Sequence, residues 1–123
     1  MNRGKALTAL QALAHDARLD LVHLLMPHGD EGLSAGEISR ALNMPASRLS
    51  FHLAALEQAG LLQSRKLARN VFYAVNTVGI GGTIGYLLND CCRADPAVRD
   101  SCQNTARTTQ WPHEPLPDET GPG

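Results

Sequence analysis

The chain has 123 residues, a formal net charge of −1, and 43% hydrophobic but only 4% aromatic residues. This length suits a single small domain with one core, and no apolar run approaches the roughly 20 residues that a membrane span needs. Residues 1–5 are basic, but no apolar stretch with a small-residue cleavage site follows them, so we expect no signal peptide and a cytoplasmic protein.

Two helices are predicted at the start of the chain. Residues 5–14 carry leucines at helical spacing, and Asp16 can cap a second helix that runs to about Met26. The side chains expected to face inward are Leu7, Leu10 and Leu13 in the first helix and Leu19, Val22 and Met26 in the second.

A third and a fourth helix follow, separated by a tight turn at residues 43–45. Ser34 and Glu37 have the spacing of a capping box, in which each side chain accepts a hydrogen bond from the backbone N–H of the other residue. The fourth helix is expected to end at Ala59, because Gly60 can adopt the left-handed conformation that closes a helix. Its buried stripe is predicted to be Leu49, Leu53 and Leu56.

Two strand-like runs come next, residues 62–66 and 71–75, with a basic hairpin tip between them. Thr77 opens a last helix that carries several glycines, each of which costs about 1 kcal/mol relative to alanine in a helix interior. These glycines indicate either a close approach between backbones or a pliable helix, and we favour pliability.

Helix, short turn, helix and a two-stranded wing is the order of a winged helix-turn-helix, so the expected fold is mainly α with a β-hairpin wing. Residues 37–70 carry five basic side chains against two acidic ones, which suits a surface that contacts phosphate and equally a chance cluster on a solvated face. Outward residues at the start of the fourth helix would meet base edges in the major groove, and basic wing residues would contact the DNA backbone or the minor groove. The residues expected to contact DNA are Ser47, Arg48, Ser50, Phe51 and His52 on the helix and Arg65, Lys66 and Arg69 on the wing.

The evidence for a family lies in three stretches, residues 12–19 (ALAHDARL), residues 47–62 (SRLSFHLAALEQAGLL) and the wing at residues 64–76. In this order and spacing they resemble the ArsR/SmtB family of metal-responsive repressors. Pro45 stands where the family often has serine, and Ala68 stands where a wing glycine is common. The resemblance implies a transcriptional repressor, not an enzyme, that binds double-stranded operator DNA as a homodimer joined by its first and last helices.

The candidate dimer stripe combines Leu7, Leu10 and Leu13 with Ile84, Leu87 and Leu88. We assign residues 1–92 to a winged-helix DNA-binding and dimerisation domain and residues 93–102 to a ligand-binding loop. Residues 103–123, which are rich in proline and polar residues and contain Trp111, are expected to form a disordered tail.

All three cysteines, Cys91, Cys92 and Cys102, fall within twelve residues. Neighbouring Cα atoms lie about 3.8 Å apart, closer than disulfides usually allow, so a bridge between Cys91 and Cys92 would be strained. Pro96 interrupts the helix, and we expect the segment after it to fold back and bring Cys102 to the pair. Three thiolates satisfy a pyramidal As(III) or Sb(III) ion, whereas zinc would need a fourth ligand.

The family resemblance implies the same inducer. A frequent arsenic site of the family is a Cys-x-Cys pair on the third helix, and residues 33–38 contain no cysteine. A frequent zinc site lies along the last helix, and residues 77–92 contain no His or Glu. What remains is similar to the members that bind As(III) through a vicinal cysteine pair and a third cysteine. The resemblance therefore implies a repressor that releases its operator when Cys91, Cys92 and Cys102 bind As(III) or Sb(III), with no organic cofactor.

Other interpretations of the cysteines stay open. They would also suit a redox or persulfide switch, simple packing of a helix end, or a zinc or cadmium site completed by His113 or an aspartate. A DNA binder without a ligand is a further alternative. The alternative among enzymes is a small thiol reductase that uses Cys91 or Cys92 as its nucleophile. Against it, the chain has no Cys-x-x-Cys motif and no base near these thiols in the sequence.

Overall fold

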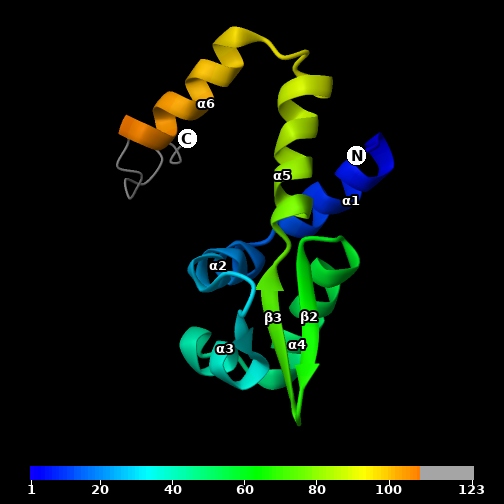
Figure 1. Cartoon of the computed structure of the whole chain (residues 1–123), viewed down its shortest axis with the longest axis vertical. Helices are drawn as coiled ribbons and strands as arrows, with labels where there is room; N and C mark the ends of the chain where they lie inside the picture. Colours follow the sequence, from blue (N-terminus) through cyan, green and yellow to red (C-terminus); the bar gives the residue numbers. More distant parts are fainter. Residues whose placement is uncertain (109–123) are drawn as a thin grey trace. The chain divides into compact units, whose positions relative to one another are not determined.

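The computed structural model describes the backbone of residues 1–108 and the side chains of residues 1–104. The chain divides into two compact units, Met1–Tyr86 and Leu87–Gly123. The elements in chain order are α1 (Arg3–Leu13), α2 (Asp16–Leu25), the 3₁₀ turn η1 (Met26–His28), β1 (Leu33–Ser34), α3 (Ala35–Leu42), α4 (Ala46–Gln58), β2 (Leu62–Leu67), β3 (Asn70–Val75), α5 (Thr77–Gly85), the π-helical turn η2 (Tyr86–Cys91) and α6 (Pro96–Thr108). The predicted winged helix-turn-helix of helices and hairpin is confirmed for the first unit (Figure 1).

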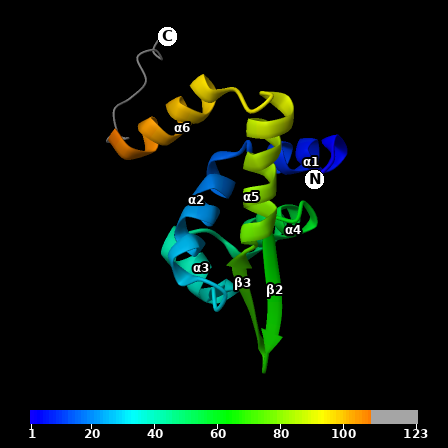
Figure 2. The same cartoon turned by 45° about the horizontal axis from the view of Figure 1, so that its top comes forward.

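The sheet has three antiparallel strands in the order β1-β3-β2. The hairpin predicted from the sequence is β2 and β3, in which Leu62 pairs with Val75 and Leu67 with Asn70. Its tip projects beyond the helices in both views of the molecule (Figure 1 and Figure 2). At the tip, Ala68 has a φ of 58°, a conformation that favours glycine. The short strand β1 was not predicted, because two residues are too few to show the alternation of apolar and polar side chains that marks a strand.

The start of α3 and the buried stripe of α4 are as predicted. The Glu37 N–H donates to Ser34 Oγ at 3.2 Å, and the Ser34 N–H donates to Glu37 Oε1 at 2.9 Å, which completes the capping box. Hydrogen bonds from the Ser34 N–H and the Ser34 side chain lower the pKa of the Glu37 carboxyl from its ordinary value. The α4 residues Leu49, Leu53 and Leu56 lie in the core of the first unit.

The inward faces of the first two helices differ from the prediction. Leu7, Leu19 and Met26 are exposed, and His15 instead of Asp16 caps α2, its Nδ1 accepting from the Ala17 N–H at 3.2 Å. Small side chains let helices approach closely, so the alanines line the buried faces while several leucines remain outside. The residues buried in these helices are Ala6, Ala9 and Ala12 in α1 and Ala17, Leu21 and Leu25 in α2.

The predicted loop at residues 93–102 is wrong, because most of it belongs to α6. Pro96 is the first residue of this helix, a position where its missing N–H costs no hydrogen bond. Asp95 caps the helix, its Oδ1 accepting from the N–H groups of Ala97 at 2.8 Å and Val98 at 3.3 Å. Residues 103–108, expected to be disordered, are helical as well. Trp111, His113 and the rest of the predicted tail lie outside the described residues.

One glycine of α5 marks a close approach between backbones. A Cβ atom on Gly79 would lie 1.9 Å from the carbonyl oxygen of Gly60, in the turn after α4. A Cβ atom on Gly81 would meet nothing within 4 Å. Pliability is therefore not needed to explain Gly79. In the part of the chain that is described, no helix is both long and apolar enough to cross a membrane.

We predict opposite outcomes for alanine at these two glycines. Gly79→Ala should lower the free energy of unfolding by about 1–3 kcal/mol or more, because the backbone of Gly60 must move away. Gly81→Ala is the matched control and should leave it unchanged or raise it by up to about 1 kcal/mol, through better helix propensity. Urea denaturation of both variants measures the difference, and equal stabilities would contradict the close packing of α5 on the turn.

Candidate nucleic-acid interface and cysteine segment

The start of α4 presents four of the five helix residues predicted to contact DNA. Ser47, Arg48, Ser50 and Phe51 are exposed, and Phe51 has 65% of its surface open to solvent. Pro45, the N-cap residue, has no side-chain oxygen to accept from the first N–H groups of α4. These donors, together with the positive end of the helix dipole, are suited to a phosphate group.

His52 does not belong to this exposed face, so its expected outward placement is wrong, while its contact with DNA remains a prediction. Only 3% of its surface is exposed. Its Nδ1 accepts a hydrogen bond of 3.0 Å from Arg18 Nε, and its ring meets the His15 ring edge to face at 4.6 Å. Burial lowers the pKa of His52, and the charges of His15, Arg18 and Arg48 lower it further.

The sequence contained a signal for this placement that the prediction missed. His52 lies three residues after Leu49, so it belongs to the same inward stripe of α4. A polar side chain on such a stripe requires a hydrogen-bond partner. The partner, Arg18, comes from the first stretch that carries the family resemblance.

The three basic residues of the wing have different surroundings. All three are exposed. Arg65 is anchored across the sheet, where its Nη2 donates to the Glu31 carbonyl oxygen at 3.3 Å and its guanidinium lies 5.2 Å from the centroid of the Phe72 ring. Since neighbouring residues of a strand point to opposite faces, Arg65 and Lys66 lie on opposite faces of the wing.

The cysteines all lie in the second unit. Cys91 is exposed, Cys92 is half-buried and Cys102 is exposed on α6, and all three thiols are free. The Cys92 N–H donates to the Leu87 carbonyl at 2.8 Å, five residues back, as in a π-turn. Arg93 and Ala94 follow with φ values of 58° and 56°, a conformation that costs about 1–2 kcal/mol for a residue with a side chain.

The structure brings two of the three thiols together. Partial burial raises the pKa of the Cys92 thiol, and the adjacent thiol of Cys91, which is within hydrogen-bonding reach, raises it further, as does Asp95. Within residues 1–108, no three His, Cys, Asp or Glu side chains are arranged to hold a metal ion. Cys102 is therefore not assembled with the pair, and the segment that was expected to bring it there is part of α6.

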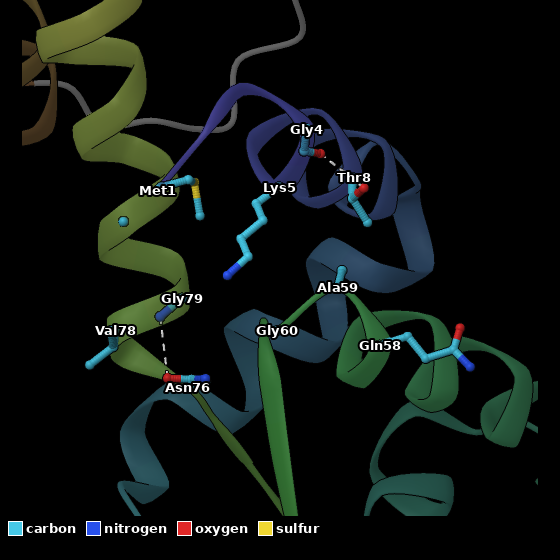
Figure 3. Close-up of a pocket in the computed structure, with 11 residues that line it drawn as sticks. Met1, Gly4, Lys5, Thr8, Gln58, Ala59, Gly60, Asn76, Val78 and Gly79 are labelled. Carbon is cyan, nitrogen blue, oxygen red and sulfur yellow. Dashed lines mark hydrogen bonds between the residues drawn. The ribbon is translucent and has the colours of Figure 1, made fainter.

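A cavity of about 530 Å³ lies between α1, the end of α4 and the start of α5. Figure 3 shows the Lys5 side chain extending into the space between α1 and α5, while the Asn76 side chain accepts from the Gly79 N–H at 3.2 Å. Lys5 is the charged residue among those that line the cavity. Val78, which also lines it, is 82% exposed and so leaves an apolar rim on α5.

Comparisons with known proteins agree with this architecture. Residues 13–65 match the model of a helix-turn-helix domain family. The chain is 37% identical over 94 residues to the transcriptional activator HlyU of Vibrio cholerae, covering 76% of this chain and 84% of that protein. It is 34% identical over 88 residues to the HTH-type transcriptional regulator YgaV of Escherichia coli, covering 72% and 87% respectively.

Solved structures agree as well. Reduced HlyU from Vibrio cholerae aligns with a TM-score of 0.57 and 37% identity over 72% of this chain and 90% of that one. An ArsR-like regulator from Rhodococcus sp. RHA1 reaches a TM-score of 0.65 at 20% identity, over 85% of this chain and 93% of that one. The homodimeric winged helix-turn-helix domain of Mb0332 from Mycobacterium bovis reaches 0.58 at 21% identity, over 89% of each chain. The last two similarities concern the fold alone.

HlyU and YgaV are each more than 30% identical to this chain over most of their own length, and both are transcriptional regulators and not enzymes. The chain therefore belongs to the family of helix-turn-helix transcriptional regulators that includes HlyU and YgaV.

Proposed function

We propose that this protein is a homodimeric repressor that binds operator DNA through α4 and the wing and releases it when its cysteines bind As(III) or Sb(III). The observation that carries the DNA-binding half is the exposed cluster of Ser47, Arg48, Ser50 and Phe51 at the uncapped start of α4. Such a helix start is the part of a recognition helix that enters the major groove, where Arg48 would pair with guanine. The relative HlyU is an activator, so it does not support repression. We propose repression from the resemblance to the ArsR/SmtB repressors.

The homodimer is supported by the exposed apolar side chains of α1 and α5. Leu7, Val78 and Ile84 lie on the surface of the first unit, where monomeric packing leaves them in water. The winged-helix domain from Mycobacterium bovis with the same fold is homodimeric. Two copies would place two α4 helices about one DNA turn apart, which matches a palindromic operator.

The inducer half is supported by the adjacent, free thiols of Cys91 and Cys92 and by a third exposed thiol, Cys102, in the same unit. Arsenous acid would exchange its three hydroxyl groups for three cysteine sulfurs and release three waters. Bringing Cys102 to the pair requires a change at residues 93–95, where Arg93 and Ala94 hold a costly left-handed conformation. A change there would act on the end of the helix that we expect to join the dimer, and so on DNA binding.

A thiol redox or persulfide switch is the second candidate. It is favoured by the absence of a three-ligand group within residues 1–108 and by the existence of a reduced form of HlyU. Because a bond between adjacent cysteines is strained, oxidation would join one of the pair to Cys102. Zinc or cadmium as inducer would need further ligands, and His113 lies outside the described residues.

We predict that Arg48 contributes sequence preference and that the wing contributes general affinity. On DNA selected from a random pool by the wild-type protein, Arg48→Ala should weaken binding by about 10- to 100-fold, and much less on unrelated DNA. Lys66→Ala and Arg69→Ala should weaken binding to both DNAs alike and reduce the salt dependence by about one counterion each.

Fluorescence anisotropy over a range of salt concentrations measures these effects. Arg99→Ala is the matched control, because it removes the same charge from α6, which we do not expect to contact DNA. If Arg48→Ala and Arg99→Ala had equal effects on the selected DNA, the start of α4 would not be the reading surface.

We predict that arsenite or antimonite releases the wild-type protein from its DNA. The Cys91→Ser/Cys92→Ser variant should bind DNA as the wild type does but no longer respond, because serine does not bind As(III). Cys102→Ser should weaken the response by removing the third sulfur. Zinc, cadmium, peroxide and polysulfide are tested in parallel. Release by peroxide or polysulfide, reversed by dithiothreitol and not produced by arsenite, would contradict the arsenic site and support the redox switch.

A further inference from the structure

A single side chain on α2 connects three parts of the first unit. Arg18 donates from Nε to His52 Nδ1 at 3.0 Å and from Nη1 to the carbonyl oxygen of Ala12, near the end of α1, at 3.3 Å. Its guanidinium carbon also lies 5.5 Å from the centroid of the Phe51 ring. Arg18 therefore links the junction of α1 and α2 to two successive residues of α4, one buried and one exposed.

The bond to His52 fixes the protonation state of this imidazole. Arginine is a donor only, so Nδ1 of His52 must carry a lone pair and the ring must be neutral, with its proton on Nε2. A proton on Nδ1 would point at the Arg18 N–H, so two hydrogen-bond donors would face each other. If the ring also kept its proton on Nε2, two positive charges would lie in contact. The charged groups that act on His52 are His15 before α2, Arg18 on α2 and Arg48 on α4, and all of them are basic.

Phe51 connects the Arg18–His52 pair to the exposed face of α4. Its ring meets the His52 ring edge to face at 5.5 Å and lies beside the Arg18 guanidinium, although the side chain is largely exposed. Arg48 and Ser50 precede it on the same exposed face. Arg18 and His52 thus contact Phe51 from the interior of the protein and restrict the direction of its side chain on this face.

We propose that Arg18 is a positioning residue for DNA binding, which holds the reading face of α4 through the neutral imidazole of His52. The proposal rests on the proposed contact of α4 with DNA, but it is independent of the cysteines. Its consequence is that acid weakens DNA binding by a route inside the protein: a proton on His52 removes the Arg18 bond and loosens the contact of Arg18 with Phe51 on the reading face.

The direction of the pH effect follows from the burial of His52. Its pKa is lowered in the folded protein, so the unfolded chain binds more protons at mildly acidic pH. The folding stability that this group contributes is complete above the ordinary histidine pKa of about 6.5 and is lost progressively as the pH falls below it. Operator binding should decline at lower pH still, where His52 of the folded protein takes up its proton.

The test compares four proteins in DNA binding between pH 7.5 and 5.0 at constant ionic strength. The wild type should lose about tenfold in affinity or more at the acidic end. His52→Asn should bind within about threefold of the wild type at pH 7.5 and show little pH dependence, because asparagine keeps an acceptor near the Nδ1 position but does not titrate. Arg18→Lys should bind about tenfold more weakly at pH 7.5 with an unchanged salt dependence, because lysine keeps the charge but loses the planar pair of donors.

His15→Asn is the matched control for the other histidine of the cluster. Asparagine retains an N-cap acceptor for the Ala17 N–H, so the loss of DNA binding in acid should persist. It should move to higher pH, because His15 no longer lowers the pKa of His52. The same acid loss in His52→Asn as in the wild type, or wild-type affinity in Arg18→Lys, would overturn the positioning role. Failure of the wild type to bind DNA at pH 7.5 would instead reject the proposed function itself.

A measurement on the wild type alone guards against variants that fail to fold. Long-range ¹H–¹⁵N spectra at pH 7.5 report which imidazole nitrogen carries the proton. The expected result is a neutral His52 ring protonated at Nε2. A proton on Nδ1, or a charged ring at this pH, would overturn the proposal.

Discussion

The inward stripe of α4 is the constraint on which the DNA-binding surface depends. Leu49, His52, Leu53 and Leu56 are all buried, and they follow the spacing of one helical face. Because these positions are fixed in the core, the positions between them at the start of the helix must point outward. Turning α4 by one residue would bury Arg48 or Ser50 and expose a leucine, at a cost of about 1.5–3 kcal/mol for the leucine alone.

Small residues determine how the other helices pack in the first unit. Ala6, Ala9 and Ala12 lie on the buried face of α1, and Gly79 lets α5 touch the turn that follows α4. With small side chains inside, the larger apolar ones of α1 and α5, such as Leu7 and Val78, are left on the surface. The same packing that builds the core therefore leaves the apolar surface on which we propose that a second copy of the chain docks.

Features set by neighbouring residues could be predicted from the sequence. The capping box at Ser34, the hairpin and the three leucines of α4 each depend on a local pattern, and each is present. The inward faces of α1 and α2 could not be predicted, because alanine and leucine are both apolar and only the distance to the next helix decides between them. The reach of Arg18 to His52, 34 residues away, likewise depends on tertiary structure. The start of α6 was predictable in principle, since Asp95 before Pro96 is a cap followed by a favoured first residue.

The most direct test of the account is an amide ¹H–¹⁵N titration of the protein with its selected DNA at pH 7.5. The account predicts that the largest shifts occur at residues 47, 48, 50 and 51 and at the wing tip. It also predicts that the Nδ1 and Nε2 signals of His52 keep the pattern of a neutral, buried ring. Shifts concentrated on α6 or η2, with the start of α4 unperturbed, would contradict the claim that the buried stripe of α4 dictates the surface that reads DNA.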